Sequence, residues 1–204
     1  MRTVSEGGVA CGGGSPVLVN CVIAENDAEE AGGGVSSTHS TPIFTGCTIS
    51  KNTARRGGGV FNEFGILKMS NCILWDDKDE EVSFGRGGEI EISYSNVQEG
   101  WQGSGNIDVD PKFVDLEVDD FRLRAGSPCI DSASIDGPET DLLGHHRPID
   151  IPGVGRDGPG AFDMGAYEFQ PPILDPHSDI NEDGVIDALD LLILLRDWQK
   201  VSGA

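Results

Sequence analysis

The first half of the chain contains an internal repeat of about 25 residues, which constrains the fold more than any single motif does. Three aligned segments each contain one cysteine, and the cysteines lie 26 and then 25 residues apart: Cys21, Cys47 and Cys72. The same spacings separate three valines that each follow glycines: Val9, Val35 and Val60. A weaker fourth copy follows at Ile92–Val97. Because separate landmarks recur at one period, the sequence predicts a stack of similar structural turns.

Apolar residues alternate within each copy, as they do in β-strands, but the phase of the alternation slips once. Asn20, Gly46 and Asn71 lie at the slip, and these residue types tolerate the left-handed backbone of a short bend between two strands. The segment at each repeat valine supplies a third strand. Three short strands and three bends predict one turn of a parallel β-helix, with successive turns about 4.8 Å apart. The usual crossover handedness favours a right-handed coil.

The pattern of glycines before a valine, followed by Asn-Cys-x-Ile and a further Asn, resembles the right-handed parallel β-helix family of pectin-lyase-like proteins. It is most similar to the Gly-rich repeats of bacterial surface proteins. The resemblance implies an all-β fold in which residues 1–104 form about three to four turns of the coil.

A series of motifs between residues 95 and 169 resembles the C-terminal end of β-helix domains in secreted proteins, often from Planctomycetes. In order they are Ser95–Gln98, Gly105–Asp108, Asp110–Phe113, Asp120–Leu123, Gly126–Asp131 and Asp163–Glu168. The resemblance implies that residues 105–170 form a cap over the last turn, where it would cover strand edges that otherwise promote aggregation. A separate catalytic domain is the alternative.

The five cysteines cannot all form internal disulfides, because their number is odd, and no pair has Cys-x-x-Cys spacing. The three repeat cysteines occupy equivalent strands, where they would stack as small apolar side chains inside the coil. A metal or redox site is the alternative, although no histidine accompanies them.

Residues 179–190 match the twelve-residue calcium loop of EF-hand proteins. The predicted ligands are the side chains of Asp179, Asn181, Asp183, Asp187 and Asp190 and the carbonyl of Val185. Ca²⁺ prefers six to eight oxygen ligands, and Gly184 permits the sharp turn inside the loop. An acidic turn that caps a helix is the alternative, but the loop's carboxylates would repel one another without an ion.

Prolines in the linker at residues 171–178 exclude a long helix before this loop, whereas an apolar stripe predicts a helix after it, at residues 188–199. A calcium loop followed by one helix resembles a type I dockerin repeat, so residues 179–204 are expected to form a small α-helical, calcium-binding module. The resemblance implies a cohesin-like partner. The chain departs from the dockerin pattern because it contains one repeat instead of two, and because Ala188 and Leu189 stand where many dockerins carry hydroxyl residues.

The formal net charge of −21 would repel phosphate backbones and argues against a nucleic-acid partner. No apolar run approaches the roughly 18 residues of a transmembrane helix, and no secretory signal lies at the N-terminus. Together with a first turn that has no preceding cap, these observations suggest the C-terminal part of a longer extracellular or cell-surface protein.

The candidate catalytic residues are Asp76 and Asp77, in an acidic turn with Lys78, Asp79, Glu80 and Glu81, because paired carboxylates can perform acid–base chemistry. A solvated turn is the alternative. The adjacent His145 and His146 make a poor metal pair, so a structural or surface role is expected for them. We therefore expect a non-catalytic, glycan-binding or adhesive β-helix protein, with a polysaccharide lyase or glycoside hydrolase as the alternative.

Overall fold

We studied the protein as a computed structural model, which describes residues 7–171. The chain divides into two units after Gln170, and all strands of the described residues belong to the first unit. Within the described residues the structure is almost entirely β, and its one helical element is the short 3-10 turn η1 (Leu116–Val118). The expected dockerin-like module, including every predicted calcium ligand, lies outside the described residues.

Twelve short strands form three sheets of four strands each, and each sheet takes one strand from every turn of the coil. The first sheet contains β1 (Val9–Gly12), β4 (Val35–Thr38), β7 (Val60–Glu63) and β10 (Val82–Phe84). The second contains β2 (Val17–Val19), β5 (Ile43–Thr45), β8 (Gly65–Ser70) and β11 (Gly88–Ser93). The third contains β3 (Val22–Ala24), β6 (Thr48–Ser50), β9 (Ile73–Trp75) and β12 (Asn96–Val97).

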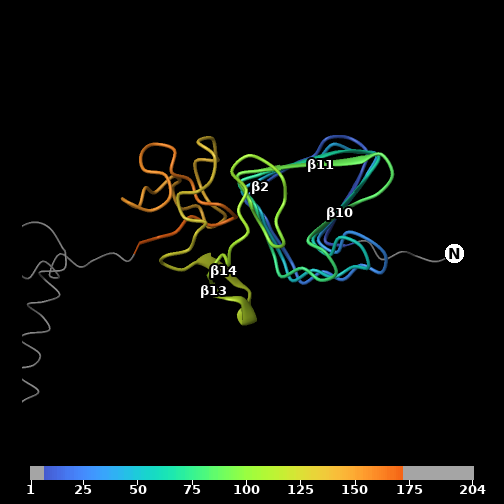
Figure 1. Cartoon of the computed structure of the whole chain (residues 1–204), viewed down its shortest axis with the longest axis horizontal. Coiled ribbons are helices and arrows are strands. Elements are labelled where there is room, and N and C mark those ends of the chain that lie inside the picture. The colour runs from blue at the N-terminus through green and yellow to red at the C-terminus, as the bar shows by residue number, and fades with distance from the viewer. Residues whose placement is uncertain (1–6, 172–204) are drawn as a thin grey trace, which may run out of the picture. The chain divides into compact units, whose positions relative to one another are not determined.

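All neighbouring strands in these three sheets are parallel, and the repeat landmarks lie in register. Val35 pairs with Val60, Phe44 with Met69, and Ile49 with Leu74. The weaker fourth copy is also a complete turn, because Ile92 pairs with Met69. The fold is therefore a right-handed parallel β-helix of about four turns, as the repeat predicts, and Figure 1 shows the turns stacked on one another.

The bends at the phase slip adopt the predicted left-handed backbone. The φ angles of Asn20, Gly46 and Asn71 are 51°, 60° and 57°, and Tyr94 takes the same conformation in the fourth turn with a φ of 48°. This bend lets the strands on both sides of it direct apolar residues into one core.

The interior of the coil is a column of stacked apolar side chains, and the repeat cysteines belong to it. Phe44, Ile49, Leu67 and Leu74 are fully buried together with two of the cysteines, Cys47 and Cys72. All five cysteines of the chain are free thiols, and the neighbouring thiol of Cys72 together with burial raises the pKa of Cys47. The structure thus supports the packing role predicted for the cysteine ladder.

The segment after the fourth turn differs from the expected cap. Only its beginning extends the coil: Ile107 bridges to Asn96, and Trp101 packs against the core of the coil. The remainder, which we call the lateral segment (residues 110–170), lies beside the coil instead of over its end (Figure 1). It contains an antiparallel hairpin of β13 (Phe113–Asp115) and β14 (Asp120–Leu123), and otherwise irregular backbone.

The lateral segment covers the outer face of the third sheet, where β9 contributes large apolar side chains. Along β9, Leu74 points into the coil, whereas Ile73 and Trp75 point outward into a second core with Phe113 and Met164. Parallel strands that are buried on both faces have nearly continuous apolar sequences, and Cys72–Trp75 is such a run. The lateral segment therefore buries the outer face of the third sheet, whereas the prediction placed it over the end of the coil.

Candidate functional site

The acidic turn that contains the catalytic candidates begins with two carboxylates in different environments. Asp76 is exposed, and its backbone N–H donates to the side chain of Gln98 at 2.7 Å. Asp77 lies in a ladder of side-chain amides inside the coil. Lys78, Asp79 and Glu80 are exposed.

This ladder, which we call the Asn ladder, consists of Asn26, Asn52 and Asp77, one from each of the first three turns. The amide Nδ2 of Asn26 donates to Oδ1 of Asn52 at 2.9 Å, and the amide Nδ2 of Asn52 donates to Oδ1 of Asp77 at 2.8 Å. The backbone N–H of each donor residue makes a parallel bond to the same acceptor, at 3.0 Å and 2.7 Å. Asp77 thus accepts hydrogen bonds that stabilise the coil, and this role competes with a catalytic one.

A hollow beside the acidic turn is lined by neither catalytic candidate. This shallow hollow of about 360 Å³ lies on the loops that follow β3, β6 and β9. It is lined by Asp27, Ala28, Glu29, Thr53, Ala54, Arg55 and Asp79. Asp79 is its one contribution from the acidic turn, and Asp76 and Asp77 do not line it. The structure therefore does not bring the two predicted carboxylates together around a common ligand space.

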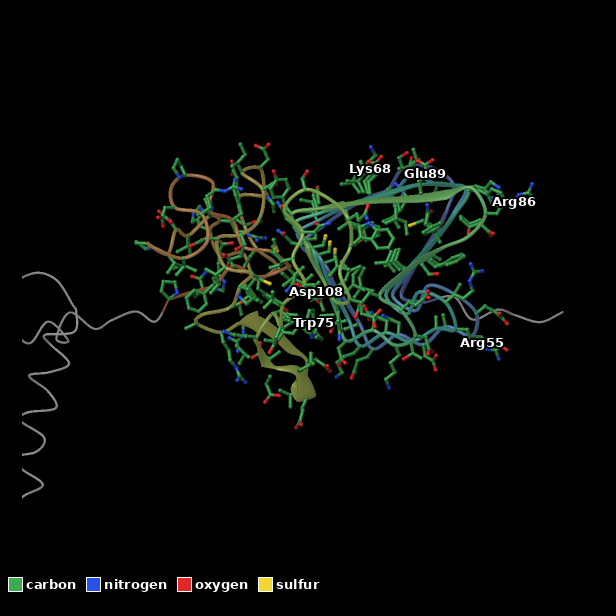
Figure 2. All side chains as sticks on the ribbon, in the orientation of Figure 1. Arg55, Lys68, Trp75, Arg86, Glu89 and Asp108 are labelled. Carbon is green, nitrogen blue, oxygen red and sulfur yellow. The ribbon has the colours of Figure 1, made fainter. Side chains whose placement is uncertain are left out.

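A better-formed site lies where β9 meets the hairpin of the lateral segment. We call it the Trp75 pocket; its volume is about 240 Å³, and it is lined by Trp75, Asp110, Lys112, Phe113, Leu116, Arg124 and Ala125. Figure 2 shows Trp75 between the coil and the hairpin. The volume is below the roughly 300–1,000 Å³ of sites for drug-sized ligands, so the pocket suits a small unit such as one sugar residue.

The polar groups of the Trp75 pocket are held by backbone contacts. Lys112 Nζ donates to the carbonyl of Gly126 at 2.8 Å, and Arg124 Nε donates to the carbonyl of Val114 at 2.9 Å. Neither cation is neutralised by a carboxylate in these contacts, and Asp110 is the one acid in the lining. The pocket therefore carries an excess positive charge beside an aromatic surface, although the chain as a whole is strongly acidic.

The Trp75 pocket was not predicted from the sequence, although one signal was present. Trp75 pairs with Ser50, which in turn pairs with Ala24, so a large aromatic residue replaces small ones at one position of the repeat. A large aromatic side chain at an outward position of the repeat indicates that another segment of the chain covers this position. The other half of the pocket comes from the hairpin, which the repeat does not describe.

A second cavity of about 220 Å³ lies on the lateral segment around His145. The Nδ1 atom of His145 lies 3.1 Å from Oδ2 of the buried Asp141, which also accepts hydrogen bonds from three backbone N–H groups: those of Leu143, His145 and Glu168. Although burial opposes it, these hydrogen bonds lower the pKa of Asp141. Asp141 is thus an ionised anchor for the loop, and this agrees with the structural role expected for His145.

A buried ion pair lies behind this cavity and joins the lateral segment to the coil. Arg147 Nε donates to Oε2 of Glu168 at 2.8 Å, and Arg147 Nη1 donates to Oδ1 of Asn20 in the coil at 3.1 Å. Burial and the nearby Glu168 raise the pKa of Asp163 to about 8. Arg147 is one positive charge among several buried acids, so the cluster stabilises the fold and leaves no open ligand site.

The described part of the chain holds no cluster of three or more histidine, cysteine or acidic residues that could bind a metal ion. The predicted calcium ligands, Asp179, Asn181, Asp183, Val185, Asp187 and Asp190, lie beyond it, and the calcium site stays a prediction. Residues 7–171 also contain no helix that is long and apolar enough to cross a membrane.

Comparisons of the chain with protein-family models, with curated proteins and with solved structures found no match. Any assignment of function therefore depends on the fold, on the Trp75 pocket and on the sequence of the predicted calcium loop.

Proposed function

We propose that the chain is an extracellular or cell-surface β-helix protein that binds glycans and attaches to a partner through a calcium-binding, dockerin-like module at residues 179–204. The glycan-binding part depends on one observation, the Trp75 pocket. An aromatic ring offers an apolar face for the C–H groups of a sugar, while Lys112 and Arg124 can donate hydrogen bonds to its oxygens.

The geometry around Trp75 suits binding better than catalysis. A glycosidase places two carboxyl groups on either side of the scissile bond, at a separation that depends on its mechanism. The lining of the Trp75 pocket contains a single carboxylate, Asp110. The proposal is therefore recognition without cleavage at this site.

The attachment part of the proposal is supported by the sequence of the calcium loop. The alternating oxygen ligands and Gly184 match the requirements of Ca²⁺, and the resemblance to a dockerin repeat supports a cohesin-like partner. Extracellular location is proposed because dockerin-like attachment and glycan binding both operate outside the cell.

Glycan binding can be tested by presenting the full chain to a panel of neutral and acidic oligosaccharides. We expect Trp75→Ala to weaken binding by about tenfold, which corresponds to about 1.4 kcal/mol, because the stacking surface is removed. Phe84→Ala is the matched control, since Phe84 is an exposed aromatic residue on β10, away from the pocket. Equal binding by the wild-type protein and the Trp75 variant would refute this site.

The alternative function, a polysaccharide lyase or glycoside hydrolase, is tested on the same panel by measuring new reducing or unsaturated chain ends. Cleavage that disappears in an Asp76→Asn, Asp77→Asn double variant would support the enzyme and contradict the binding proposal. Binding without cleavage is the expected result.

Calcium binding can be measured by calorimetric titration of the full chain. We expect heat of binding that is lost in an Asp179→Asn, Asp183→Asn double variant, because two of the predicted carboxylate ligands become neutral. Asp108→Asn is the control, since Asp108 is an exposed acid of the first unit. The absence of binding heat in the wild-type chain would remove calcium from the proposal.

A further inference from the structure

The Asn ladder ends at two carboxyl groups, those of Asp77 and Glu81, within the turn between β9 and β10. The backbone N–H of Asp77 donates to Oε1 of Glu81 at 3.0 Å, while Oδ1 of Asp77 accepts the bonds from Asn52. One oxygen of each group is left, Oδ2 of Asp77 and Oε2 of Glu81. Both of these oxygens are buried, and no donor among the described residues reaches them. The side chain of Glu81 belongs to a residue that is only 4% exposed.

The surroundings of this pair are tightly packed. A Cβ atom added to Gly59 would lie 2.5 Å from Oδ2 of Asp77, so no side chain could replace that glycine without displacing the carboxyl group. The carbonyl of Glu81 also accepts a hydrogen bond from Val60 of β7 at 2.8 Å. Two carboxylates enclosed in this way would repel each other strongly if both were ionised.

No cation of the described part of the chain compensates the two acids. Within residues 7–171 neither Asp77 nor Glu81 forms an ion pair. The nearby charged side chains act elsewhere: Asp76 adds a further negative charge, Lys78 is exposed, Arg55 pairs with Glu30, and Arg56 stacks on Phe61. The site must therefore limit its own negative charge.

We propose that Asp77 and Glu81 share one proton, which is held by Glu81 and donated to Asp77, and that loss of this proton releases strand β10 from the coil. The shared proton gives a partner to the two oxygens that otherwise have none. The step is a simple acid–base equilibrium, in which a carboxylic acid and a carboxylate become two carboxylates and the proton goes to solvent. This inference goes beyond glycan binding and is independent of it.

The pKa values agree with this arrangement. Burial, followed by the charge of Asp77 and the hydrogen bond to it, raises the pKa of Glu81 to about 10. Burial also raises the pKa of Asp77 to about 6, although the hydrogen bond from Glu81 opposes the rise. Because the folded-state pKa of Glu81 exceeds its ordinary value of 4.5, the stabilisation is complete below that value and is lost as the pH rises toward 10.

The consequence falls on β10, which begins directly after Glu81. This strand is the last of the first sheet and pairs there with β7 alone. Repulsion between two carboxylates would push the turn away from Gly59 and detach β10 from β7. Because β10 is already the edge strand of this sheet, its release would move the free edge to β7 in alkaline solution, which makes the pair a proton-sensitive latch for β10.

The proton can be followed directly in the wild-type protein by the carboxyl carbon resonances of Asp77 and Glu81 in a pH titration. We expect the Glu81 resonance to remain that of a carboxylic acid at pH 7. A Glu81 resonance that is already that of a carboxylate at pH 7 would overturn the proposal, whatever the variants do.

The latch itself is tested by amide hydrogen exchange and thermal unfolding between pH 6 and pH 10. We expect the protection factors of Val82–Phe84 and the unfolding temperature of the wild-type protein to fall over this range. In Glu81→Gln the protection factors should stay nearly constant, because the amide keeps the donor to Asp77 and carries no charge. The unfolding temperature of this variant should fall less than that of the wild-type protein, since the buried Asp163, with a pKa of about 8, still loses its proton in this range. Glu80→Gln is the matched control and should fall as the wild-type protein does.

A second variant tests the pair as a unit. Asp77→Asn keeps the acceptor for Asn52 and supplies a donor to Glu81, so it should also reduce the alkaline loss of protection. The double variant should resemble either single variant, because each removes the same interaction. Additive effects of the two substitutions, or an equal alkaline loss in Glu81→Gln and in the wild-type protein, would contradict a shared proton.

Discussion

The coil and the lateral segment of this chain are stabilised in different ways. In the coil, each turn repeats the same strands, the same buried positions and the same backbone hydrogen bonds between strands. These contacts involve mainly uncharged groups. In the lateral segment the backbone is irregular, and its loops depend on buried acids and on Arg147. Stability in a repeat is shared among similar interfaces, whereas an irregular loop can depend on a single side chain.

The comparison is tested most severely at Arg147, which bonds to both regions. We expect Arg147→Met to lower the free energy of unfolding by about 3–5 kcal/mol, because the substitution leaves Glu168 buried without its partner. Urea denaturation measures the loss. Arg86→Met, at an exposed position of the coil, should change stability by less than about 0.5 kcal/mol. Similar small effects at both positions would show that the ion pair does not hold the lateral segment.

The Asn ladder provides an intermediate test inside the coil. We expect Asn52→Ala to cost about 1–3 kcal/mol, because the backbone N–H and the amide of Asn26 lose their acceptor and Asp77 loses its amide donor. The loss should be smaller than at Arg147, since neutral groups of the ladder retain other backbone contacts. Urea denaturation again gives the value, with Ser83→Ala in β10, outside the ladder, as the control. A loss larger than that of Arg147→Met would reverse the comparison.

The last test concerns the stacked cysteines, Cys21, Cys47 and Cys72. It involves no change in stability and measures only how accessible each thiol is in the folded protein. Cys21 lies in the first turn and is partly exposed, whereas Cys47 and Cys72 are fully buried. In the native protein at pH 8 we expect a thiol reagent to label Cys21 before the other two, whereas complete labelling of all five cysteines should require unfolding. Mass spectrometry of peptides from the labelled protein identifies the sites. Early labelling of Cys47 would mean that the core of the coil opens readily.

Most of the coil could be predicted from the sequence because its information is local and repeated. The spacing of Cys21, Cys47 and Cys72 determined the register of the third sheet, and Asn20, Gly46 and Asn71 identified the left-handed bends. Each of these positions acts through its own residue type and its nearest equivalents in the next turn. The weaker fourth copy followed the same rules.

The candidate site could not be predicted in the same way. The acidic turn was identified, but its sequence does not show that Asp77 joins the Asn ladder or that Glu81 is buried beside it, since both depend on contacts with earlier segments at Asn52 and Gly59. The Trp75 pocket needs a strand of the coil and a hairpin that lies 38 residues later along the chain, from Trp75 to Phe113. The calcium loop stays a sequence prediction.

The sequence alone therefore determined an all-β coil of about four turns, its register and the stacking of its cysteines, because a strict repeat leaves few ways to bury its apolar positions. Only the tertiary structure decided where the lateral segment lies, which face it covers, and which acids share a closed space. Those outcomes depend on contacts between segments that have no common period, where burial changes the charge state of a side chain such as Glu81.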